Sequence, residues 1–167
     1  MFLSEFNQAD PKQIQALLQH CVHIRRWADN IIKNRPFNTV DHLLKFAKDQ
    51  ANSWSWDEID SALNTHPRIG EKQAKAVLSA QENIFSNREQ AALSPTEATL
   101  DALYEGNLAY EKKFGFIFLI KATGLNSEQI LTALNTRLLN DIELEKKGVH
   151  QQLLDIALLR LAQEIQA

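Results

Sequence analysis

Residues 141–165 have the sequence DIELEKKGVHQQLLDIALLRLAQEI, which predicts one long helix. Its apolar side chains recur at helical spacing, and Leu154, Leu158 and Leu161 share one stripe. Such a stripe is typical of a helix that packs one face against a core. The end of the chain therefore indicates a bundle of helices.

Start and stop signals extend this interpretation to nearly the whole chain. Pro36 and Pro67 predict helix ends, because the residue before a proline is disfavoured in the α conformation. Side chains that can cap the start of a helix occur at Asp10-Pro11, Thr39, Ser55-x-x-Glu58, Ser94-Pro95-x-Glu97 and Ser127. We expect an all-α fold: a single-domain helical bundle of about seven to nine helices, formed by residues 1–167.

Residues 114–120, FGFIFLI, are ambiguous because their composition also permits a β-strand. A single strand would have no pairing partner in an otherwise helical chain. We therefore predict a buried helix here, with Gly124 at its C-terminal cap.

Composition narrows the classes of function. The 167 residues are 44% hydrophobic and 23% charged, with a net charge of −3, which argues against nucleic acid as the main partner. Cys21 is the only cysteine, so no internal disulfide can form and a reducing compartment is expected. The N-terminus lacks the pattern of a secretory signal, and no apolar stretch is long enough to span a bilayer. We expect a cytoplasmic protein without a membrane partner.

Common cofactor and metal signatures, such as a glycine-rich phosphate loop, CxxC pairs or HExxH, are absent from the sequence. The segment His66-Pro67-Arg68-Ile69-Gly70 is the strongest local candidate for chemistry. A histidine on a rigid turn can direct its imidazole into a pocket. The alternative is a helix terminator whose histidine stabilises the negative end of the helix dipole.

The hexapeptide His66-Pro67-Arg68-Ile69-Gly70-Glu71 resembles a signature of the 2-oxo-4-hydroxy-4-carboxy-5-ureidoimidazoline (OHCU) decarboxylases. Other segments resemble motifs of that family in the same order along the chain. They are Arg35-Pro36-Phe37, Trp56, Ser86-x-x-Glu89-Gln90, Tyr110-Glu111-x-Lys113-Phe114-Gly115-Phe116 with Phe118-Leu119-Ile120, Arg137-Leu138-x-Asn140-Asp141-x-x-x-Glu145 and the LLRL of residues 158–161. The resemblance covers essentially the whole chain.

This resemblance implies a homodimeric enzyme that needs no metal or organic cofactor. It implies His66 as the catalytic acid, assisted by Glu89 and Arg160. It also implies ligand contacts from Pro67, from Ser86, Asn87, Arg88, Glu89 and Gln90, and from Ile120, Lys121 and Ala122. Lys121 departs from the small or apolar residue that is common at its position in the family.

The reaction implied is decarboxylation of OHCU to (S)-allantoin in urate catabolism. Each assisting residue also has a structural explanation, since Glu89 can complete a capping box with Ser86 and Arg160 can extend along the helix to Glu164. Two other functions stay open. One is a related lyase for another ureido or imidazoline acid, and the other is a non-catalytic helical module that binds a partner.

Overall fold

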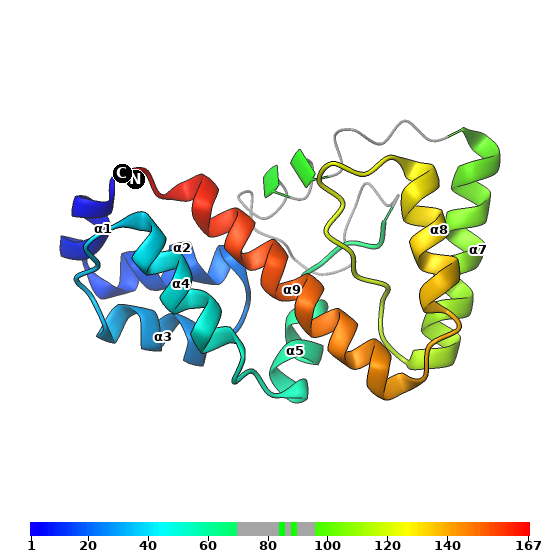
Figure 1. Cartoon of the computed structure of the whole chain (residues 1–167), viewed down its shortest axis with the longest axis horizontal. Coiled ribbons are helices and arrows are strands. Elements are labelled where there is room, and N and C mark those ends of the chain that lie inside the picture. Colours follow the sequence, from blue (N-terminus) through cyan, green and yellow to red (C-terminus); the bar gives the residue numbers. More distant parts are fainter. Residues whose placement is uncertain (70–83, 86–87, 90–95) are drawn as a thin grey trace. The chain divides into compact units, whose positions relative to one another are not determined.

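The computed structural model describes residues 1–69, 84–85, 88–89 and 96–167 (Figure 1). Eight labelled helices and no β-strand occur in this described part, so the expectation of an all-α chain is confirmed. The helices are α1 (Leu3–Gln8), α2 (Pro11–Cys21), α3 (Arg25–Lys33), α4 (Val40–Ala51), α5 (Trp56–Leu63), α7 (Glu97–Phe114), α8 (Ser127–Arg137) and α9 (Ile142–Glu164). Among them, none is long and apolar enough to cross a membrane.

The chain divides into two compact units. The first consists of Met1–Ala62 and Leu154–Ala167, and the second of Leu63–Leu153. α9 supplies residues to both units, and the single-domain organisation stays a prediction.

In the first unit, α2 packs on α3 and α3 packs on α4 (Figure 1). Trp27 of α3 is buried, and its indole N–H donates to the carbonyl oxygen of Ala47 in α4 at 2.8 Å. Asp10 and Thr39 cap α2 and α4 as predicted, because each side chain accepts a backbone N–H of the first turn. The starts of α2 and α4 could therefore be predicted from the local sequence.

In the second unit, α7 and α8 pack side by side (Figure 1). Gly106 permits this close approach, because a Cβ at that position would lie 2.5 Å from Cδ2 of Leu134 in α8. Ser94 and Pro95, the predicted start of this helix, lie outside the described residues. In the described part, the Thr96 side chain caps α7 by accepting the N–H of Thr99 at 3.2 Å.

The predicted helix over residues 114–120 is wrong. α7 ends at Phe114, because Gly115 adopts a left-handed conformation with φ of 83°. Residues after it run through the interior without helix or strand pairing, and the rings of Phe114, Phe116 and Phe118 pack around Tyr110. Side chains from elsewhere satisfy backbone groups of this segment, which removes the need for a helix.

Two smaller expectations also fail at the end of this segment. Gly124 lies in the turn before α8 with φ of 81°, and is not the cap of a helix. Asn126, not Ser127, caps α8, because its side chain accepts the N–H of Gln129 at 2.8 Å. Ser127 is the first residue of that helix.

Candidate functional site

His66 lies three residues beyond the end of α5. The capping box predicted for this helix is present, since the Ser55 N–H donates to Glu58 and the Glu58 N–H donates to the Ser55 hydroxyl. At the other end, the His66 N–H donates to the carbonyl oxygen of Leu63 at 3.0 Å. The residue is only 8% exposed, so its imidazole is largely shielded from bulk water.

The residues after His66 are attached to α7. The Arg68 side chain places Nε 2.8 Å and Nη2 2.7 Å from Oε1 of Glu111. One turn earlier on α7, the Asn107 amide donates to the carbonyl oxygen of Ile69 at 3.4 Å. The turn that carries His66 is thus held on both sides, by the end of α5 and by the buried face of α7.

The predicted ligand segment Ile120–Ala122 belongs to the same unit as His66. Ile120 and Ala122 are buried, and Lys121 is of intermediate exposure. The Lys121 N–H donates to Oε1 of Gln152 in α9 at 2.8 Å. The backbone of this non-helical segment is therefore attached to α9 by a side chain.

An ion-paired network lies next to that segment. Arg137 of α8 donates from Nη1 to the carbonyl oxygen of Leu119 at 2.6 Å. Its Nε donates to Oε1 of Glu145, which also accepts the Tyr110 hydroxyl at 2.5 Å. Burial, and then the hydrogen bond to Glu145, raise the pKa of the Tyr110 phenol above its ordinary range. Arg137 therefore positions the backbone that precedes Ile120.

Sequence reasoning did not identify Glu111, Glu145 or Gln152 as part of this region. Glu111 and Glu145 are themselves members of the motif segments that begin at Tyr110 and Arg137, so their place in those motifs was a usable signal. Gln152 carried none, because its partner is a backbone group 31 positions earlier in the sequence.

The second predicted ligand segment is described only in part. Arg88 is helical and exposed, and Glu89 is helical and half-buried. Ser86, Asn87 and Gln90 lie outside the described residues. Whether Glu89 completes a capping box with Ser86 stays a prediction.

Arg160 lies on the part of α9 that belongs to the first unit. Its residue exposure is 4%, and Nη1 donates to the carbonyl oxygen of Cys21 at 3.4 Å. Burial raises the pKa of the Cys21 thiol to about 12, while the nearby Arg160 charge acts in the opposite direction. Cys21 is thus a core thiol, and Arg160 is a guanidinium held in a nearly dry environment.

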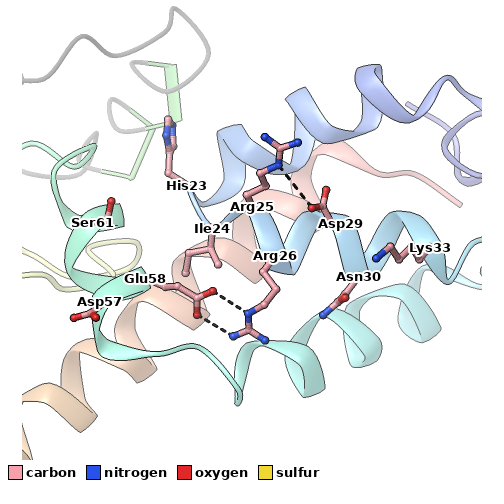
Figure 2. A pocket seen from close by; sticks show the side chains of 10 residues that line it. All are labelled: His23, Ile24, Arg25, Arg26, Asp29, Asn30, Lys33, Asp57, Glu58 and Ser61. Carbon is pink, nitrogen blue, oxygen red and sulfur yellow. Dashed lines mark hydrogen bonds and ion pairs between the residues drawn. The ribbon is translucent and has the colours of Figure 1, made fainter.

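A hollow of about 580 Å³ opens on the first unit between α3 and α5 (Figure 2). Arg26 and Glu58 face each other across it, with Nη2 and Oε2 at 2.9 Å. This contact lowers the pKa of Glu58 to about 2. None of the sequence-predicted site residues lines the hollow, and four of its charged residues form the pairs Arg26–Glu58 and Arg25–Asp29.

Comparison with known proteins agrees with the motif pattern. The uric acid degradation bifunctional protein TTL of Arabidopsis thaliana is 36% identical over 116 residues, which are 68% of this chain and 34% of that protein. The 2-oxo-4-hydroxy-4-carboxy-5-ureidoimidazoline decarboxylase of Haloferax volcanii is 27% identical over 136 residues, 81% of this chain and 79% of that one. The chain spans about a third of the length of the plant relative.

A solved structure shares the fold. It is a crystal structure of OHCU decarboxylase in the presence of (S)-allantoin, with a TM-score of 0.74 and 24% identity over 93% of this chain and 98% of that chain. The sequence model described as OHCU decarboxylase matches residues 7–162. This chain therefore belongs to the OHCU decarboxylase family.

Proposed function

We propose that this protein decarboxylates OHCU to (S)-allantoin during urate breakdown. The observation that carries the proposal is the shielded position of His66, on a turn held at both ends, within a chain that matches the family over residues 7–162. A shielded imidazole on a fixed turn suits stereospecific delivery of a proton.

The proposed chemistry needs one proton and no external electron sink. The substrate carries its carboxylate on a carbon next to a ring C=N bond. When the bond to the carboxylate breaks, its electron pair forms a C=C bond to the imine carbon, the C=N π pair moves onto the ring nitrogen, which takes up a proton, and carbon dioxide leaves. His66 then protonates the former imine carbon on one face, while the neighbouring hydroxyl gives up its proton and becomes the ring carbonyl. The net uptake is one proton, and the product is one enantiomer of allantoin. The protein contributes orientation and electrostatic stabilisation.

Glu89 and Arg160 complete the proposed catalytic set. Glu89 would orient His66 or the substrate hydroxyl. Arg160 would hold carbonyl or ureido oxygens with its planar fork of donors. Its low exposure supports this role, because a dehydrated guanidinium forms stronger hydrogen bonds than one in water.

We propose ligand contacts from Pro67, from residues 86–90 and from the segment Ile120–Ala122. Ile120 and Ala122 are buried, which suits contact with a ring that is shielded from water. Lys121 at the family's small or apolar position favours the second candidate, a related lyase for another ureido acid.

We also propose that both compact units form one functional domain, because the family match extends through both.

We propose further that the protein is a cytoplasmic homodimer. A stripe on α7 offers a face for the second copy: Leu100, Tyr104 and Leu108 follow at four-residue spacing and are 40%, 63% and 47% exposed. Light scattering after chromatography tests this. Tyr104→Lys should shift a dimer towards monomer, and a wild-type monomer would contradict the proposal.

The test of the reaction is a substrate panel. OHCU is unstable, so urate oxidase and hydroxyisourate hydrolase would generate it from urate in the same cuvette, and other ureido acids would be supplied directly. Turnover of OHCU above the enzyme-free rate supports the proposal. Turnover of another acid alone would favour the related lyase, and no turnover of any acid would favour a binding module.

A further inference from the structure

Two side chains of α7 anchor the turn that follows His66, and the chemistry proposed above uses neither of them. Glu111 binds the Arg68 side chain through contacts of 2.7 and 2.8 Å. Asn107 donates to the carbonyl oxygen of Ile69. The residues that they bind, Arg68 and Ile69, lie two and three positions after His66.

These contacts are partly shielded from water. The side chains of Arg68 and Glu111 are 25% and 21% exposed, and Asn107 is 4% exposed. Hydrogen bonds to charged groups are stronger than neutral ones, and shielding strengthens them further. The two donors from Arg68 also converge on one oxygen, which restricts the guanidinium to a narrow range of orientations.

The contacts to α7 and the bond to Leu63 bracket His66. Before the histidine, its own N–H is bound to the end of α5. After it, the side chain of Arg68 and the carbonyl of Ile69 are bound to α7. Pro67 stiffens the chain between these points, because its ring fixes φ. The direction of the imidazole therefore depends on both attachments.

We propose that Glu111 and Asn107 are positioning residues for His66, acting through Arg68 and the backbone of Ile69. This inference rests on the proposed function, in which His66 delivers a proton to one face of the substrate. A displacement of about 1 Å at a reacting group can cost about 100-fold in rate. Loss of either anchor should therefore impair the proton transfer more than ligand binding.

Glu111→Gln tests the ion pair, and Asn107→Ser tests the amide. For each variant, kcat per folded molecule, KM and the enantiomeric excess of allantoin would be measured. We expect kcat to fall about tenfold or more, KM to change less than about threefold, and the excess of the (S) form to decrease. Glu105→Gln is the matched control, since it removes the same charge from an exposed position of the same helix and should leave all three unchanged.

Two further variants separate positioning from a general loss of structure. The charge reversal Arg68→Glu with Glu111→Arg should recover part of the activity that Glu111→Gln loses. Arg68→Lys keeps the positive charge but loses the planar guanidinium that binds Glu111. If Glu111→Gln does not fold, this variant tests the same ion pair from the Arg68 side. A merely structural role would lower the folded fraction and leave the enantiomeric excess as in wild type, once the product of the enzyme-free reaction has been subtracted at equal amounts of folded protein.

The inference would be overturned if the wild-type protein turns over OHCU and both Glu111→Gln and Asn107→Ser keep its kcat per folded molecule and its enantiomeric excess. Absence of turnover in the wild-type protein would overturn the proposed function itself. The two failures are thus distinguishable in one set of assays.

Discussion

Arg137 and Glu145 form a shielded ion pair that ties α8 to α9 behind the predicted ligand segment. Nη2 of Arg137 lies 2.5 Å from Oε1 of Glu145, and the two side chains are 14% and 1% exposed. The Asn140 amide donates to the second carboxylate oxygen at 3.0 Å. Arg137 also donates to the carbonyl oxygen of Leu119, the residue before Ile120. The ion pair therefore both stabilises the second unit and fixes the position of Ile120.

Glu145→Gln should destabilise the protein by about 3–5 kcal/mol, because it leaves the shielded Arg137 charge without a counter-charge. Urea unfolding followed by circular dichroism measures the change. The matched control is Glu143→Gln in the same helix, whose side chain is 78% exposed and which should stay within about 0.5 kcal/mol of wild type. Equal stability of the two variants would contradict this account of the network.

The Tyr110 phenol should stay protonated in the folded protein when the pH reaches about 11, well past the ordinary tyrosine pKa of about 10. Burial and the hydrogen bond to Glu145 raise its pKa. In an alkaline titration of tyrosinate absorbance, Tyr110→Phe should therefore have the same amplitude as wild type up to that pH. Loss of amplitude in the variant would show that the phenol ionises in the folded state.

The Cys21 thiol should react slowly with iodoacetamide in the native state. Its pKa of about 12, against an ordinary value of 9.0, lowers the reactive thiolate fraction about a thousandfold near neutral pH. Because the chain has one cysteine, the labelling rate by mass spectrometry reports this residue alone. Equal rates in native and urea-unfolded protein would rule out the buried assignment.

The Arg26–Glu58 pair should contribute stability that depends on pH. The contact lowers the Glu58 pKa from 4.5 to about 2 in the folded protein, so folding favours the ionised form. The contribution is therefore fully present above about pH 5 and lost as the pH falls towards 2. Its size should be about 0.2–1 kcal/mol, since Arg26 is 48% exposed and water screens the pair.

Urea unfolding of wild type and Glu58→Gln at several pH values checks that contribution. The stability difference between them should shrink on acidification. A difference that stays constant from neutral pH down to about pH 2 would contradict the assigned pKa shift.

Local signals predicted much of the helical architecture. Asp10, Thr39 and the Ser55–Glu58 box each place a helix start where the structure has one, because capping is an interaction between near neighbours in the sequence. The place of His66 just beyond the end of α5 was likewise predictable, since a histidine before a proline at a helix end is a local pattern, while its catalytic role stays a prediction.

The path of residues 116–122 could not be predicted in this way. Their irregular backbone is bound by Arg137 and Gln152, which lie 18 and 31 positions from their partners in the sequence. The contact between Arg68 and Glu111 spans 43 positions and has no local signature either. Composition thus identified a buried segment, while its conformation depends on tertiary donors.

The most direct measurement of the central claim follows optical activity while OHCU is generated from urate in the presence of this protein. We predict a rapid rise of the (S)-allantoin circular dichroism signal with wild type. His66→Asn, folded by its far-ultraviolet spectrum, should show only the slow enzyme-free background. Full activity of the folded His66→Asn variant would contradict the assignment of His66 as the proton donor, and no wild-type signal above background would contradict the proposed reaction.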